Sequence, residues 1–199
     1  HSHGVAHRDV KCDNVIYDRF GGSGSVKLCD LGFAVQLSAA EPLCTDFPGT
    51  CAYAPPEVVA GAAPYDPFLA DVWALGVTAF VMLTASMPFG LHNNHHTRAA
   101  VLSDRPFPLT SPALRNAPDE LLHFLHVTLE KNWRQRATLN DLLSLPFARL
   151  DSEEVRAVVP PLRRIAPLRL SQVALPPPLD LAPITGVQQR CQHIQQQQQ

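Results

Sequence analysis

The residues best suited to chemistry lie in two short segments near the start of the chain. Residues 7–14 contain Asp9, Lys11 and Asn14, and a second segment contains Asp30 directly after a short strand-like stretch. Carboxylate and carboxamide oxygens bind Mg²⁺, and a lysine ammonium stabilises phosphate charge. A positioned carboxylate also accepts the proton of an attacking hydroxyl. Together these side chains suit the binding of a Mg²⁺-bound triphosphate and the deprotonation of a hydroxyl group.

Short strands and one long loop are expected to position these residues. Val15 to Tyr17 and Ser25 to Cys29 favour strands, and the glycine-rich stretch 21–24 favours a turn, so we expect a β-hairpin. The remainder of residues 1–17 predicts a helix end followed by a loop. Residues 33–56 lack sustained periodicity and contain four prolines. They predict one long surface loop, and loops of that length in a compact domain usually carry function.

The rest of the chain up to about residue 149 favours helices. Apolar spacing and capping residues place them at Pro56 to Val59, Leu69 to about Ser86, Thr97 to Leu102, Asp119 to Lys131, and from a cap at Thr138 to before Pro146. The fold class is therefore mainly α, with a small hairpin.

One of these helices also has the length of a membrane span. Val72 to Leu91 is uncharged and mostly apolar. Pro88 and Gly90 should end the helix by about Ser86, so a buried core helix is the expected interpretation.

Composition narrows the class of protein. Of 199 residues, 46% are hydrophobic and 17% charged, which suits a globular domain. The net charge of −2 argues against non-specific nucleic-acid binding. The five cysteines form no C-x-x-C pair, so neither a zinc site nor a disulfide framework is expected. We expect a reducing, cytoplasmic compartment and no membrane association.

Two polar regions give little support for a binding site. His92, His95 and His96 cluster in a predicted polar loop without a carboxylate at ligand spacing, which disfavours a metal site. From residue 150 proline, leucine and arginine dominate, and glutamines close the chain. We therefore expect one domain over 1–149 and a disordered tail rich in proline and glutamine over 150–199.

The order of the motifs resembles the catalytic domain of eukaryotic Ser/Thr protein kinases. The matching residues are His7-Arg8-Asp9 with Asn14, Asp30-Leu31-Gly32, Pro55-Pro56-Glu57, Asp71 to Gly76, and Arg136-Ala137-Thr138. Ala52 to Glu57 and Ser86 to Phe89 look most like testis-specific serine kinases, which belong to the calmodulin-dependent-like group.

The resemblance covers residues 1–149 and implies the larger helical lobe of the kinase fold. That lobe is C-terminal and carries a small β-hairpin at the catalytic site. The family's N-terminal β lobe, with its Gly-rich loop, strand lysine and helix glutamate, finds no match in the chain. We therefore expect a truncated fragment of a kinase that is inactive alone.

The resemblance also implies roles for the polar residues near the start of the chain and for Thr50. Asp9 would orient the substrate hydroxyl, and Lys11 would lie near the γ-phosphate. Thr50 would help to select Ser/Thr substrates. Asn14 and Asp30 would bind Mg²⁺, so the implied cofactors are ATP and Mg²⁺ and the implied partner is a protein with a Ser or Thr acceptor.

The long loop resembles an activation segment. Asp46 occupies the position where many relatives carry a phosphorylated threonine, and its carboxylate offers a permanent partner for Arg8. Thr45, next to it, is a candidate phosphosite. The alternative is that Asp46 is a solvated loop charge.

Three further residues are implied to be structural. Glu57 and Arg136 match a buried ion pair between the activation segment and the helical lobe. Asp71 should accept backbone hydrogen bonds from His7 and Arg8, which would explain a charge at the head of an apolar helix. Leu31 stands where the family has Phe and is expected to pack beneath the metal-binding loop.

Two alternatives stay open. A degenerate pseudokinase acting as a binding or scaffold module is the rival to an enzyme. The intact Asp9, Lys11, Asn14 and Asp30 favour the enzyme, whereas the truncation favours the rival. Cys29, just before Asp30, is either a reactive thiol in the nucleotide pocket or, as we favour, an inert buried one.

Overall fold

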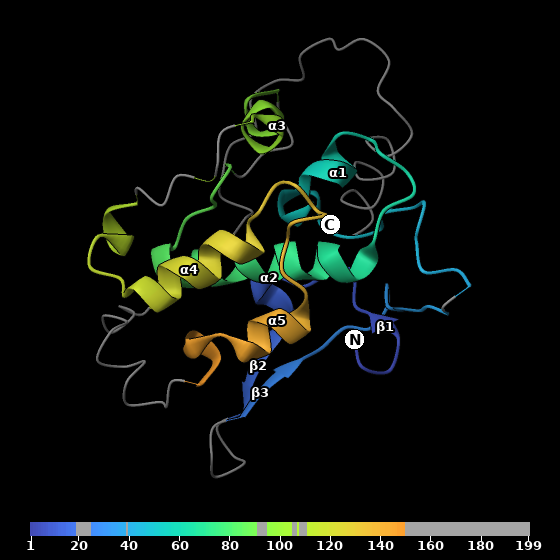
Figure 1. Ribbon diagram of the computed structural model, residues 1–199, viewed down its shortest axis with the longest axis horizontal. Helices are drawn as coiled ribbons and strands as arrows, with labels where there is room; N and C mark the ends of the chain where they lie inside the picture. The colour runs from blue at the N-terminus through green and yellow to red at the C-terminus, as the bar shows by residue number, and fades with distance from the viewer. Residues whose placement is uncertain (19–24, 39, 91–94, 105–106, 108–110, 150–199) are drawn as a thin grey trace.

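The computed structural model is mostly helical, with a few short strands (Figure 1). It describes residues 1–18, 25–38, 40–90, 95–104, 107 and 111–149. The glycine-rich turn, His92 and the tail predicted for 150–199 lie outside the described residues.

The longest helix, α2 (Pro67–Thr84), runs through the centre of the fold (Figure 1). It begins two residues before the predicted Leu69 because the Asp66 carboxylate accepts hydrogen bonds from the N–H groups of Phe68 and Leu69, at 2.9 and 3.3 Å. By length and composition α2 could cross a membrane, but 56% of it is buried inside the fold. Burial of this extent is typical of the core helix that the sequence predicts.

Helix α4 (Asp119–Thr128) packs against α2 and completes the main apolar core. Leu121 and Leu125 point into this core and are almost fully buried. Gly76 of α2 allows the two helices to approach closely, because a Cβ at that position would collide with Thr128. The helix ends at Thr128, three residues before the predicted Lys131.

Two separate antiparallel pairs of strands flank the helices. Strands β2 (Val15–Asp18) and β3 (Ser25–Leu28) form the predicted hairpin, with Val15 opposite Leu28. Strands β1 (Val5–Ala6) and β4 (Val35–Gln36) form the second pair. The predictions of a helix end within residues 1–17 and of one long surface loop over 33–56 are therefore wrong where these two strands lie. Both errors have one cause, because this pairing joins distant segments and leaves no local periodicity.

The remaining helices are short. They are α1 (Pro56–Val59), α3 (His95–Leu102), α5 (Leu139–Ser144) and the 3₁₀ turns Cys12–Asn14, Cys51–Tyr53, Pro112–Leu114 and Pro146–Arg149. Helix α3 begins two residues before the predicted start. The cap of α5 is confirmed: the Thr138 hydroxyl accepts from Asp141 N–H at 3.3 Å, and the Asp141 carboxylate accepts from Thr138 N–H at 2.8 Å.

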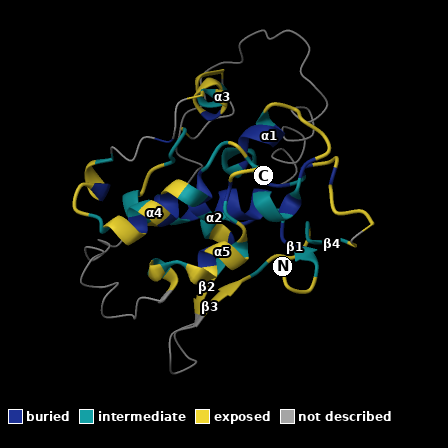
Figure 2. Ribbon diagram, in the orientation of Figure 1, coloured by how far each residue is buried: buried dark blue, intermediate teal, exposed yellow. Residues whose placement is uncertain are grey.

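A second, smaller apolar cluster lies beneath the long loop. It consists of Cys44, Phe47, Ala54, Val58, Tyr65 and Ala70. Cys12, Cys29 and Cys44 are free thiols, and Cys51 is disulfide-bonded. The hairpin lies at the surface and its apolar side chains are largely exposed, with Tyr17 at 58% and Val26 at 67% (Figure 2).

Candidate active site

The segment that carries Asp9 is fastened to the head of α2. The buried Asp71 carboxylate accepts hydrogen bonds from the backbone N–H groups of His7 at 2.7 Å and Arg8 at 2.8 Å. Both contacts expected of Asp71 are therefore present. Burial raises the pKa of Asp71, although the two N–H groups oppose that rise. His1 also contacts this carboxylate, at 3.0 Å from its Nε2 atom.

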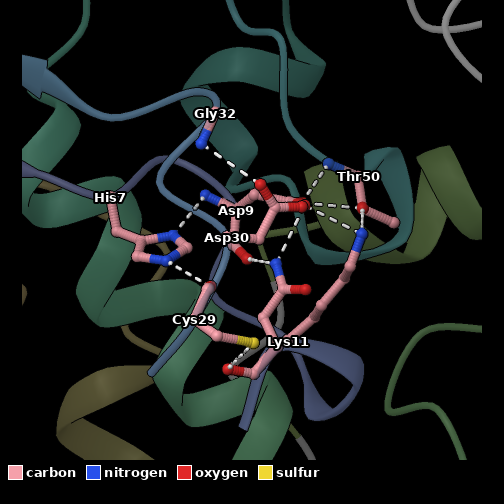
Figure 3. A network of polar contacts seen from close by, with 8 residues as sticks. His7, Asp9, Lys11, Cys29, Asp30, Gly32 and Thr50 are labelled. Atoms are coloured by element: carbon pink, nitrogen blue, oxygen red, sulfur yellow. Dashed lines mark hydrogen bonds and ion pairs between the residues drawn. The ribbon is translucent and has the colours of Figure 1, made fainter. Parts of the chain in front are cut away.

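The Asp9 carboxylate is the centre of a closed polar network (Figure 3). Its Oδ1 atom accepts hydrogen bonds from the Thr50 N–H at 2.9 Å and the Thr50 hydroxyl at 2.7 Å. Its Oδ2 atom lies 2.8 Å from Lys11 Nζ, which also donates to the Thr50 hydroxyl at 2.9 Å. The structure thus brings together all three residues predicted to be catalytic.

The environment of Asp9 keeps its carboxyl group ionised. Burial raises the pKa, but hydrogen bonds from Lys11 and Thr50 outweigh this and hold the pKa below its ordinary value. Asp9 is 4% exposed, so water screens its charge only weakly. An ionised carboxylate can only accept hydrogen bonds. A group that orients a substrate hydroxyl must be such an acceptor.

Asn14 is oriented by Asp9 as well. Its side-chain N–H₂ group donates to the Asp9 carbonyl at 2.8 Å and to the Asp9 carboxylate at 3.2 Å. This orientation uses the amide nitrogen and directs the amide oxygen elsewhere. The Asn14 carbonyl accepts from Cys29 N–H at 2.9 Å, which joins the start of the hairpin to the residue before Asp30.

Asp30 lies at a tight, exposed turn. Its backbone has a positive φ of 63°, and its Oδ1 atom accepts from Gly32 N–H at 3.1 Å. The preceding residue is held by His7, whose Nε2 atom lies 3.1 Å from the Cys29 carbonyl (Figure 3). Leu31 is 67% exposed, so the prediction that it packs beneath this loop is wrong within the described part of the chain.

The donor atoms of Asn14 and Asp30 fit Mg²⁺. Both residues offer oxygen, which this hard cation prefers. Nowhere in the described residues do three or more His, Cys, Asp or Glu side chains form a group able to hold a metal ion. Two protein ligands are nevertheless enough for Mg²⁺, which usually completes its shell with water and phosphate oxygens.

The predicted activation-loop residues are placed unequally. Arg8 Nη1 lies 3.3 Å from the Asp46 carboxylate and 3.4 Å from the Asp46 carbonyl, so this expected pair is present. Arg8 Nε also donates to the Phe33 carbonyl at 2.7 Å. Thr45 is exposed beside Asp46. Gly49 lies so close to the Arg8 carbonyl that a Cβ at this position would collide with it.

The predicted ion pair between Glu57 and Arg136 is present and bidentate. The two guanidinium–carboxylate distances are 2.7 and 2.9 Å, and Arg136 is 4% exposed. Arg136 also donates to the carbonyls of Leu69 and Glu130, at 3.0 and 2.9 Å. This pair joins α1 to the loop before α5.

Sequence reasoning missed one residue near the site. Tyr65, between α1 and α2, is 4% exposed, and its hydroxyl donates to the Asp46 carbonyl at 2.9 Å. It belongs to no motif, and its contacts are with residues about twenty positions earlier. Only an aromatic residue just before the Asp66 cap hinted that this loop is buried.

Comparison with known proteins agrees with this site. The chain matches the family described as "Protein kinase domain" over residues 1–148, and it belongs to that family. The mouse (Mus musculus) testis-specific serine/threonine-protein kinase 3 is 47% identical over 90 residues, which cover 45% of this chain and 32% of that protein.

Other relatives match more of the chain. Sperm motility kinase Z of Mus musculus is 36% identical over 153 residues, covering 74% of this chain and 28% of that protein. Testis-specific serine/threonine-protein kinase 2 of Mus musculus is 30% identical over 148 residues, covering 72% and 39%. The chain thus spans about a third of the length of these relatives.

Proposed function

We propose that the chain is the C-terminal, helical lobe of a serine/threonine protein kinase that transfers the γ-phosphate of ATP to protein hydroxyls. The observation that carries this proposal is the network in which Lys11 and Thr50 converge on the buried Asp9 carboxylate. A loop-capping aspartate needs no lysine at 2.8 Å and no two hydrogen bonds from a residue 41 positions away.

The geometry supports a defined division of roles. Asp9 accepts a hydrogen bond from the substrate hydroxyl and orients it towards the phosphate, and Lys11 places a positive charge beside the transferred group. Phosphoryl transfer has a loose transition state, so this positioning contributes more than the basicity of Asp9. Asn14 and Asp30 would hold Mg²⁺, which neutralises charge on the triphosphate.

We assign serine/threonine specificity to the contact between Lys11 and Thr50. The Thr50 hydroxyl donates to Asp9 and accepts from Lys11. In this proposal, these two hydrogen bonds hold Thr50 where it contacts the acceptor side chain of the substrate. The relatives described as serine/threonine kinases favour this specificity. The finer placement among testis-specific kinases of the calmodulin-dependent-like group is part of the proposal, as is a cytoplasmic location.

A pseudokinase-like binding or scaffold module is the second candidate. The observation that favours it is the exposed apolar surface beside Asp30, where Leu31 is 67% and Leu28 46% exposed. Such a surface suits contact with another protein segment. The retained Asp9 network favours the enzyme, because a scaffold gains nothing from a lysine held against a buried carboxylate.

A phosphoryl-transfer assay decides between these functions. The complete natural protein is incubated with Mg²⁺, γ-labelled ATP and a library of Ser-, Thr- and Tyr-containing peptides. We expect label on Ser and Thr peptides, its loss on chelation of Mg²⁺, and a fall of at least about 100-fold in kcat for Asp9→Asn. Transfer that is equal in wild type and Asp9→Asn would contradict the proposal.

Two expectations about the 199-residue chain are tested beside it. The chain by itself, assayed in parallel, is predicted to be inactive. Limited proteolysis of the same chain is predicted to remove residues 150–199 and to leave the domain over 1–149 intact.

A further inference from the structure

Tyr65 contacts the loop that carries Asp46 in three different ways. Its backbone exchanges two hydrogen bonds with Cys44, at 2.9 and 2.8 Å. Its hydroxyl donates to the Asp46 carbonyl at 2.9 Å. Its ring meets the Phe47 ring edge to face, with centroids 6.0 Å apart. One buried residue therefore contacts three of the four residues 44–47, Cys44 through its backbone and Asp46 and Phe47 through its side chain.

The position of Tyr65 is fixed by the start of α2. The next residue, Asp66, caps that helix, and Asp71 within the first turns holds the backbone N–H of Arg8. The same end of α2 thus positions Asp46 through Tyr65 and Arg8 through Asp71. The two partners of the loop ion pair are both set by one rigid helix.

The Arg8–Asp46 pair is weak without such support. Its contacts of 3.3 and 3.4 Å are longer than the roughly 2.7–2.9 Å of strong charge-assisted hydrogen bonds. The Asp46 side chain is 48% exposed, so water screens its charge. The Tyr65 hydroxyl gives the Asp46 carbonyl a shorter hydrogen bond, at 2.9 Å, in a partly buried place. Burial raises the pKa of Tyr65, which keeps the hydroxyl protonated and able to donate.

We propose that Tyr65 is a positioning residue for the phosphoryl-transfer site: its hydroxyl orders residues 44–50, so that Asp46 meets Arg8 and Thr50 reaches Asp9 without covalent modification of the loop. This inference rests on the proposed kinase function and gives the regulation of the same site. Thr50 is four residues beyond Asp46. Between them, Gly49 packs closely against the Arg8 carbonyl, so ordering of Asp46 also restricts the position of Thr50. The competing interpretation is that Tyr65 only fills the core, in which case phenylalanine would serve equally well.

Tyr65→Phe separates these interpretations, because it keeps the ring and the backbone bridge and removes only the hydroxyl. In the complete natural protein we expect amide hydrogen exchange within residues 44–50 to quicken about 3- to 10-fold. The same loss of a hydroxyl at the exposed Tyr17, in Tyr17→Phe, should leave exchange of this loop unchanged. Unchanged exchange in Tyr65→Phe would overturn the proposal.

Kinetics and a double variant test whether the effect reaches the site. We expect Tyr65→Phe to lower kcat for peptide about 3- to 10-fold with KM for ATP unchanged, and to add less than about 2-fold in an Asp46→Ala background. Independent, multiplying effects of the two changes would show that Tyr65 does not act through the Arg8–Asp46 pair, which would contradict the proposal. If wild type transfers no phosphate, the proposed function fails, while the exchange measurement still decides the role of Tyr65.

Discussion

Two arginine–carboxylate pairs hold the long loop to the rest of the fold, and they are built differently. Glu57 and Arg136 form a bidentate pair at 2.7 and 2.9 Å that is almost completely buried. Arg8 and Asp46 form a single guanidinium–carboxylate contact at 3.3 Å, with the Asp46 side chain half exposed. Both pairs join a guanidinium to a carboxylate. Their expected difference in strength therefore comes from burial and hydrogen-bond geometry.

Because of this difference, we expect the Glu57–Arg136 pair to affect the stability of the fold and the Arg8–Asp46 pair to affect activity. Removing a partner of the buried pair leaves a charge without water or counterion, which is costly. Removing Asp46 from the other pair should cost less, because the Arg8 side chain left behind is 12% exposed and still donates to the Phe33 carbonyl at 2.7 Å. We therefore expect variants at Glu57 and Arg136 to change folding, and variants at Arg8 and Asp46 to change activity more than folding.

The largest effect is expected for Arg136→Ala. It leaves the buried Glu57 carboxylate without a counterion and removes the hydrogen bonds to the carbonyls of Leu69 and Glu130. The free energy of unfolding should therefore fall by about 3–5 kcal/mol. Urea denaturation measures this, with the exposed Arg134→Ala as a control expected within about 0.5 kcal/mol of wild type. Glu57→Leu combined with Arg136→Met should recover much of the loss, because it leaves no buried charge. A midpoint for Arg136→Ala equal to that of Arg134→Ala would refute the assignment.

The next effect concerns Asp9, which is buried like Glu57 but belongs to the site. Its pKa in the fold lies below the ordinary 3.8. The unfolded chain thus binds its proton more readily, and the ionised carboxylate contributes stability that is present above about pH 3.8 and is lost as pH falls through the folded pKa. Asp9→Asn should therefore cost about 1.5–3 kcal/mol near pH 7, and the difference from wild type should shrink below pH 4. A difference that is the same at pH 7 and pH 3 would show that the carboxylate charge does not matter.

How much of the structure the sequence predicts depends on whether a feature is local or joins distant segments of the chain. The helices, the hairpin and the capping of α5 follow from local spacing, and the Asp9, Lys11, Asn14 and Asp30 set follows from motif order. The β1–β4 pair and the role of Tyr65 do not, because each depends on contact between segments that are far apart in the chain. The exposure of Leu31 was also missed, since an apolar residue carries no sign of whether another segment covers it.

The smallest effect on stability is expected for Asp46→Ala, and it sharpens the comparison most. Loss of this exposed pair should lower the free energy of unfolding by no more than about 1 kcal/mol, and added salt should reduce even that. Exposed Glu41→Ala, in the same loop, serves as the control for removing one acidic charge. If the pair orders the loop, kcat falls while the unfolding midpoint hardly moves, which is the opposite of the pattern for Arg136→Ala. An Asp46→Ala protein with full activity would mean that Asp46 is only a solvated charge, and that Tyr65 and the Glu57–Arg136 pair suffice to hold Thr50 against Asp9.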